Sequence, residues 1–184
     1  MMRIISGSKR GKKLLSLEGD NTRPTLERVK QSFFNAIQFE ISGTTVLDLF
    51  SGSGQLGLEA LSRGAEFCYF NDSSKNACDI IQKNINACDF AKISQLTCKT
   101  HTDCVKIIKD RGVKLSLVFL DPPYNYNLVN DSLECLHSHN VLQNGALIVC
   151  ETALSETVSH PSFKERKVYT YSSLKVTVLC YERE

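Results

Sequence analysis

Four consecutive residues, Asp121-Pro122-Pro123-Tyr124, combine groups that could bind a planar base and act on its amine. They follow the apolar run 115–120, which predicts a buried strand. The two prolines end that strand and stiffen the turn, because each fixes its own φ and restricts the residue before it. Tyr124 could stack on the base, while Asp121 and a proline carbonyl accept hydrogen bonds from an exocyclic NH2. The tetrapeptide therefore predicts a catalytic loop for a base amine; the alternative is an ordinary turn after a strand.

A second candidate site is the glycine-containing segment 48–57, which follows another apolar run. It holds a G-x-G-x-x-G pattern that begins with Gly52 and Gly54, and such glycines let the backbone approach a ligand closely. Asp72 ends the next predicted strand, twenty residues after Gly52, where its carboxylate could accept both ribose hydroxyls. These features fit either a dinucleotide or S-adenosylmethionine (AdoMet).

Asp48 favours AdoMet over a dinucleotide. A carboxylate four residues before the first glycine could help to hold the methionyl ammonium, whereas it would repel the negative charge of a pyrophosphate. The alternative for Asp48 is a polar residue that faces the loop. Phe50 joins the cofactor-binding candidates from the same segment. Asp103 follows the third predicted strand and could accept from the adenine amine, or could simply be an acidic residue favoured in a first helical turn.

From residue 44 onward, short apolar runs alternate with amphipathic segments. The predicted strands are 46–50, 67–70, 93–98, 115–120 and 146–150, with helices at 56–61, 77–88, 104–108 and 128–138. Two alternating runs, 166–171 and 174–181, predict a C-terminal antiparallel hairpin. This order predicts an α/β fold with a mostly parallel sheet covered on both faces. It fits the seven-stranded, Rossmann-like class I fold of AdoMet-dependent methyltransferases.

The N-terminal part differs in pattern and in charge. Residues 3–5 and 13–15 predict a small β-hairpin, and 25–39 a helix. Residues 1–30 hold eight Lys or Arg against three acidic residues, whereas the rest of the chain is slightly acidic. A basic extension over 1–40 on a catalytic domain over 41–184 suggests a polyanionic partner such as nucleic acid. The alternative is a solvated, lysine-rich terminus.

Composition narrows the class of protein. The hydrophobic fraction of 42% and charged fraction of 23% are ordinary for a globular chain. No apolar run has membrane length and no signal-peptide pattern opens the chain, so we expect a cytoplasmic protein with no membrane partner. The eight cysteines form no C-x-x-C pair and fall in apolar patterns, which predicts reduced core residues and no metal site.

Several motifs together resemble one known family, the bacterial 16S rRNA guanine-N2 methyltransferases of the RsmD type. The segments that carry the resemblance, in order, are 3–7, 10–14, 23–30, 47–54, 56–63 and 121–124. The R-P-T-x-x-R-V part of segment 23–30 is the most specific, because generic methyltransferases lack it. The resemblance covers 1–155 well and implies AdoMet as methyl donor. It also implies a guanine N2 amine of 16S rRNA as acceptor, within the small ribosomal subunit or an assembly intermediate.

The same resemblance implies roles for single residues. Asp121 to Tyr124 would form the catalytic loop, and the cofactor site would include Asp48, Gly52, Gly54, Asp72 and Asp103. The residues expected to face RNA are Lys9, Arg10, Lys12, Arg23 and Arg28. Arg23 and Arg28 could instead tie the N-terminal helix to the body through ion pairs. Two other functions stay open: an adenine-N6 methyltransferase, whose tetrapeptide is similar, and a non-catalytic ribosome-assembly factor. A nicotinamide-dependent oxidoreductase is a more distant possibility.

Overall fold

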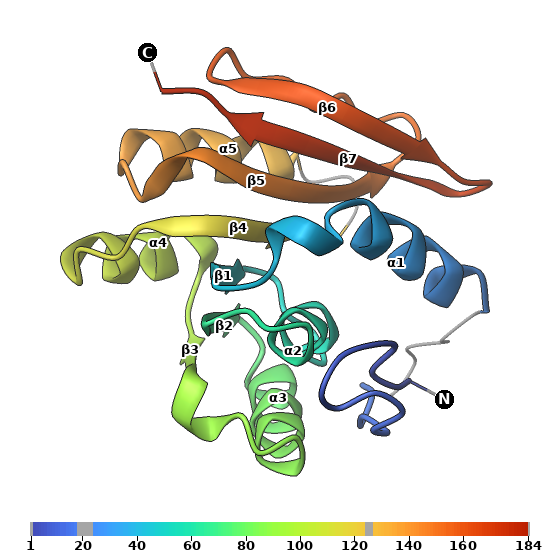
Figure 1. Ribbon diagram of the computed structural model, residues 1–184. Coiled ribbons are helices and arrows are strands. Elements are labelled where there is room, and N and C mark those ends of the chain that lie inside the picture. Colours follow the sequence, from blue (N-terminus) through green and yellow to red (C-terminus); the bar gives the residue numbers. More distant parts are fainter. Residues whose placement is uncertain (1, 18–23, 124–126, 184) are drawn as a thin grey trace.

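A seven-stranded sheet forms the centre of the molecule, with the strand order β3-β2-β1-β4-β5-β7-β6 (Figure 1). The structure is a computed structural model that describes residues 2–17, 24–123 and 127–183, without the side chains of 24–28. The strands are β1 Thr45–Asp48, β2 Phe67–Asp72, β3 Ser94–Cys98, β4 Leu115–Leu120, β5 Leu142–Ala153, β6 Phe163–Thr170 and β7 Leu174–Tyr181. The helices are α1 Pro24–Ala36, α2 Gln55–Ser62, α3 Lys75–Ala87, α4 His101–Asp110 and α5 Leu128–Ser138, with 3-10 turns at Gln38–Glu40 and Ala91–Ile93.

Helices cover both faces of this sheet. Neighbouring residues of a strand point to opposite faces, and both faces carry apolar side chains that must be buried. In β1, Val46 belongs to an apolar cluster with residues of α1, α2 and α3, whereas Leu47 belongs to a second cluster with residues of α4 and α5. Phe33 and Phe34 of α1 pack near Phe119 of β4 in the first cluster. The predicted α/β fold is therefore confirmed.

The direction of winding changes between β1 and β4. The chain builds β1, β2 and β3 outward in one direction, and then crosses back to place β4 on the other side of β1. All pairs among these strands and β5 are parallel, while β7 pairs antiparallel with both β5 and β6. The predicted C-terminal hairpin is thus confirmed. In open sheets of this kind, ligands bind beyond the carboxyl ends of the strands at the point where winding reverses.

The N-terminal segment 2–17 is less regular than predicted. The two expected strands reduce to one β-bridge between Arg3 and Lys13. The N–H of Ile4 donates to Lys12 O and that of Leu14 donates to Met2 O, both at 3.0 Å, whereas the N–H groups of Ile5 and Ser6 donate to Glu59 of α2. The segment still belongs to the core, since the buried Met2, Ile4 and Leu14 lie in the same apolar cluster as α1 and β1.

The cysteines agree with a reduced core. All eight are free, and six of them are buried: Cys68, Cys78, Cys88, Cys104, Cys135 and Cys150. Burial raises the pKa of the Cys104 thiol to about 11, which keeps it protonated. Among the described residues no group of three or more His, Cys, Asp or Glu is placed to hold a metal ion. No helix in the described ranges is long and apolar enough to cross a membrane.

Candidate active site

The strand register brings three predicted site carboxylates to one edge of the sheet. Asp48, the last residue of β1, lies opposite Phe70 in β2 and opposite Phe119 in β4. Asp72 and Asp121 therefore lie two residues further along the two strands that flank β1. The prediction that the end of β1 and Asp121 share this edge is confirmed by the pairing. The roles of the three carboxylates stay predictions.

The glycine loop is tied directly to Asp72. The backbone N–H of Gly52 donates to Asp72 Oδ2 at 2.9 Å, and the N–H of Ser74 donates to Oδ1 at 2.9 Å. Each carboxylate oxygen has a second lone pair, so both remain able to accept a ligand hydroxyl. A Cβ added at Gly52 would meet nothing within 4 Å, which leaves space above the loop.

Asp48 supports the helix that follows the loop. The N-cap residue of α2, Gly54, has φ of 80° and offers no side chain to cap the helix. Asp48 Oδ2 takes this place by accepting the backbone N–H of Gly57 at 2.9 Å. Asp48 is only 1% exposed. Burial raises its pKa to about 7, although the Gly57 N–H and the positive charge of Lys30 act in the opposite direction.

Gly57 is required for close packing between α2 and β2. A Cβ at this position would lie 2.3 Å from the Phe70 ring and 2.7 Å from Cys68 Sγ. Neither distance is possible for a real side chain, so the third glycine of the pattern serves helix–strand contact.

Asn71 of β2 joins the loop after β1 to the loop after β3, a role that the sequence did not reveal. It is 1% exposed, and its side-chain amide donates to Leu49 O at 3.2 Å and to Lys99 O at 3.0 Å. Its backbone N–H donates to Ser51 Oγ at 3.1 Å, and that hydroxyl donates to Asp48 O at 2.7 Å. The only sign in the sequence was a polar residue between an apolar strand and Asp72.

Phe50 and Asp103 lie near the start of α4. The centroids of the Phe50 and His101 rings are 5.9 Å apart. Asp103 is in the first turn of α4, and its side chain is 52% exposed and paired with Lys106 at 3.5 Å. A hydrogen bond from Thr100 lowers the Asp103 pKa, because it favours the ionised form. Asp103 thus lies where the alternative interpretation expected it, as an acidic residue in the first turn of a helix. Its contact with adenine stays a prediction.

The tetrapeptide 121–124, predicted to be catalytic, is described only in part. Asp121 follows β4 directly and is partly exposed, Pro122 is buried and Pro123 is exposed. The predicted stacking residue, Tyr124, lies outside the described residues.

The predicted RNA-facing residues have different surroundings. Lys9 pairs with Asp89 at 2.8 Å and lies over the Phe90 ring, so its charge is engaged within the protein. Arg10 and Lys12 are exposed. Arg23 lies outside the described residues, as does the side chain of Arg28 in α1.

Polar side chains of α2 fix the N-terminal segment to the body. Glu59 Oε2 accepts the N–H of Ile5 at 2.7 Å, and Oε1 accepts that of Ser6 at 3.0 Å. Ser62 accepts the Lys9 N–H through its hydroxyl at 2.9 Å and donates to Ser6 O at 2.6 Å. Segment 56–63 carried the family resemblance, but its sequence alone did not show what these polar residues bind.

A second anchor comes from α3. The buried Asn84 accepts the N–H of Leu15 at 2.8 Å and donates to Leu15 O and to Ser53 O, both at 2.9 Å. Ser53 Oγ in turn lies 3.0 Å from Met2 Sδ. The N-terminal segment is therefore in direct contact with the glycine loop.

The comparisons with known proteins agree with this architecture. The sequence profile of a family described as conserved hypothetical protein 95 matches residues 2–179. The chain belongs to this family. Its relatives include a putative rRNA methyltransferase of Bacillus subtilis, 34% identical over 95% of this chain and 97% of the relative. The ribosomal RNA small subunit methyltransferase D of Haemophilus influenzae is 34% identical over 87% of this chain and 83% of its own length. The resemblance to the RsmD type is thereby confirmed.

Two solved structures are similar to this protein over nearly the whole chain. A putative methylase from Haemophilus influenzae has a TM-score of 0.81 at 29% identity and covers 98% of both chains. A putative methyltransferase from Escherichia coli has a TM-score of 0.87 at 24% identity, covering 100% of this chain and 99% of the other, which supports the fold. The class I methyltransferase fold expected from the sequence is confirmed.

Proposed function

We propose that this protein transfers a methyl group from AdoMet to the exocyclic N2 amine of a guanine in 16S rRNA. The observation that carries the proposal is the register of β2, β1 and β4, in which Asp72 and Asp121 of the D-P-P-Y sequence lie at one edge of the sheet, on the two strands that flank β1. Two relatives in the family are named as a putative rRNA methyltransferase and a ribosomal RNA small subunit methyltransferase. These names support rRNA as the substrate class. The choice of guanine N2 rests on the family resemblance and the tetrapeptide.

The residues around the glycine loop fit AdoMet chemically. Asp72 has one free lone pair on each carboxylate oxygen for the ribose hydroxyls, next to the open space above Gly52. Asp48 is a buried carboxylate under the same loop, and its charged form would be favoured by the ammonium of the methionyl part. Phe50 offers an aromatic surface near Asp103 for the adenine. When bound, AdoMet supplies a methyl group that its sulfonium already activates.

The chain's own residues must then orient the acceptor and handle its proton. Asp121 accepts a hydrogen bond from the guanine amine and holds the nitrogen lone pair toward the methyl group, while Tyr124 stacks on the base. Such positioning can lower a barrier by about 7–11 kcal/mol in favourable cases. As the new N–C bond forms and the S–C bond breaks, the amine nitrogen gains positive charge. The carboxylate of Asp121 stabilises this charge and takes the released proton.

Nucleoside analysis tests the reaction. Small ribosomal subunits from cells that lack this activity are incubated with the protein and methyl-labelled AdoMet, and their RNA is digested to nucleosides. We expect label in N2-methylguanosine. Label in N6-methyladenosine would point to the adenine enzyme, and binding of subunits without any transfer would point to an assembly factor.

The role of Asp121 is tested by substitution. We expect Asp121→Ala to lower kcat by about 10²–10⁴, because the acceptor and proton-taking group is lost, while the Kd for AdoMet changes little. Asp121→Asn keeps one acceptor oxygen without the charge, so its kcat should lie between those of the wild type and of Asp121→Ala. Turnover of Asp121→Ala close to that of the wild type would exclude the proposed role.

A further inference from the structure

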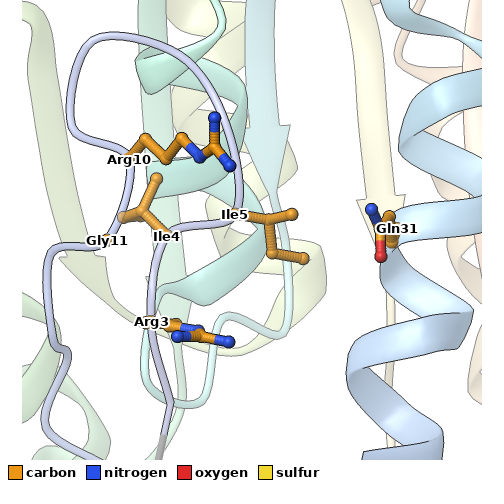
Figure 2. Close-up of a pocket in the computed structure, with 6 residues that line it drawn as sticks. All are labelled: Arg3, Ile4, Ile5, Arg10, Gly11 and Gln31. Carbon is orange, nitrogen blue, oxygen red and sulfur yellow. The ribbon is translucent and has the colours of Figure 1, made fainter.

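A polar cavity of about 270 Å³ lies between the N-terminal segment and α1. Its lining residues are Arg3, Ile4, Ile5, Arg10, Gly11 and Gln31 (Figure 2). The arginines come from two different stretches of the segment, and both side chains extend toward the α1 side, with Ile5 between them (Figure 2). Gln31 lies across the cavity on α1 (Figure 2). Of these residues only Arg10 was expected to contact RNA.

The described residues place no carboxylate against the charges of this cavity. Within the part of the chain that the structure describes, neither Arg3 nor Arg10 forms an ion pair, in contrast to Lys9, which pairs with Asp89. Two guanidinium groups and a carboxamide give only nitrogen donors and one amide oxygen, with no carboxylate among the lining residues. Guanidinium groups match the geometry of phosphate oxygens and bind them with paired hydrogen bonds.

The cavity wall is held in place by buried contacts. Glu59 and Ser62 bind the backbone of residues 5–9, and a Cβ at Gly7 would lie 1.8 Å from Ser62 O, so the segment rests closely on α2. The arginines are therefore carried on a backbone that is fixed before any ligand arrives. A fixed backbone lowers the entropy that binding would otherwise cost.

Residues adjacent in sequence to the cavity lining contact α2 and the glycine loop. Gln31 follows Lys30, whose side chain donates to Gln55 at the first position of α2 and whose charge acts on Asp48. Met2, which precedes the lining residue Arg3, contacts Ser53 of the glycine loop through Sδ. A strand held in the cavity would thus pass close to the loop.

We propose that this cavity binds one phosphodiester unit of a single-stranded rRNA segment that flanks the modified guanine, an inference that rests on the proposed function. Arg3 and Arg10 bind the phosphate oxygens, Gln31 donates from the opposite wall, and Ile5 packs against the ribose. The cavity volume of about 270 Å³ lies just below the usual range for ligand pockets, about 300–1,000 Å³. This size suits one nucleotide backbone unit and excludes a duplex.

The test compares two charge-matched double variants. Arg3→Gln/Arg10→Gln removes the cavity cations, and Lys109→Gln/Arg183→Gln removes two exposed cations from α4 and from the end of the chain. Affinity is measured by fluorescence anisotropy with a labelled 12-nucleotide oligouridylate at several salt concentrations. The cavity variant should bind roughly tenfold more weakly. Its negative slope of log K against log salt should become shallower by about 0.7, the value for one phosphate on a single strand. The control variant should keep the wild-type slope to within a few tenths.

Two further arms separate a built site from a diffuse positive field. The same oligonucleotide with uncharged methylphosphonate linkages should bind the wild type and the cavity variant equally weakly. Gln31→Glu, which places a carboxylate opposite the arginines, should weaken binding of the normal oligonucleotide more than Gln31→Ala does. Equal losses for the cavity and control variants would overturn the proposal. The proposal would also be overturned if inorganic phosphate displaced the oligonucleotide at a concentration equal to that of the oligonucleotide's phosphodiester groups. That result would indicate a site for the free anion.

Failure of this inference can be told apart from failure of the proposed function. The cavity variant should raise the KM for small ribosomal subunits, with kcat at saturation and the Kd for AdoMet close to wild type. If the wild type makes no N2-methylguanosine, the proposed function fails, yet the anisotropy measurements still decide whether the cavity binds phosphodiesters. If N2-methylguanosine forms but KM does not change in the cavity variant, only the inference about the cavity is wrong.

Discussion

Two buried carboxylates, Asp48 at the end of β1 and Glu59 within α2, have different surroundings although each is 1% exposed. Glu59 accepts the N–H groups of Ile5 and Ser6 and the guanidinium of Arg63, at 2.7 Å to 3.0 Å. Asp48 accepts the N–H of Gly57, and within the described residues no cation bonds to it directly. A buried carboxylate that accepts several hydrogen bonds is compensated for its lost hydration and can hold its donors in place. A buried carboxylate with few donors destabilises the fold until a cation binds beside it. The contrast suggests that Glu59 serves the fold and Asp48 serves the ligand.

The largest effect should come from breaking the anchor. Glu59→Gln replaces one acceptor oxygen by an NH2 group that faces an N–H donor, so at least one buried donor loses its partner. We expect the free energy of unfolding to fall by about 3 kcal/mol, measured by urea denaturation. Glu66→Gln, at an exposed position, is the matched control and should change stability by less than about 0.5 kcal/mol.

Amide hydrogen exchange adds a local readout to the same variant. The amides of Ile5 and Ser6 should exchange faster in Glu59→Gln than those of β1, since the N-terminal segment loses its anchor first. Uniform loss of protection across the sheet would mean that Glu59 stabilises the core generally, and would remove the distinction between the two carboxylates.

A second test of the anchored segment uses two glycines with nearly the same backbone angle. Gly7 and Gly11 have φ of 82° and 83°, but a Cβ at Gly7 would lie 1.8 Å from Ser62 O, whereas one at Gly11 would meet nothing within 4 Å. Gly11→Ala should therefore cost only the strain of positive φ, about 1 kcal/mol. Gly7→Ala should cost about 2 kcal/mol or more in urea denaturation, because the segment must also move away from α2. Equal costs would show that the close approach to α2 contributes no stability.

The sequence was sufficient to predict those parts that depend on local patterns. The alternation of apolar strands and amphipathic helices predicted the sheet, and G-x-G-x-x-G with Asp72 located the loop that the Gly52–Asp72 hydrogen bond now defines. Prolines 122 and 123 gave the end of β4 in the same way. Each of these signals is contained within a short stretch of residues, where spacing alone restricts the structure.

The parts that escaped prediction depend on contacts between distant residues. Glu59 binds Ile5 across 54 positions, and Lys9 binds Asp89 across 80, so no local pattern distinguishes these side chains from ordinary surface charges. The cavity between Arg3 and Gln31 likewise exists only because buried contacts fix the N-terminal segment against the body. A count of basic residues in 1–30 could not show that Lys9 pairs with Asp89, whereas Arg3 and Arg10 form no ion pair with the residues that the structure describes.

The last prediction concerns the charge on Asp48 and appears as a dependence of stability on pH. Because the pKa of Asp48 is raised to about 7 in the folded state, from 3.8 when exposed, the folded protein binds more protons than the unfolded chain between these values. The free energy of unfolding should therefore decrease as pH rises from about 4 to 7, by at most about 1.4 kcal/mol per pH unit from this residue, and level off above pH 7. Asp48→Asn keeps an oxygen that can accept the Gly57 N–H but does not titrate. The stability of the wild type minus that of Asp48→Asn, followed by urea denaturation from pH 5 to pH 8, should fall and then become constant. A difference that does not change with pH would mean that Asp48 is as well compensated as Glu59, and the contrast between the two carboxylates would be lost.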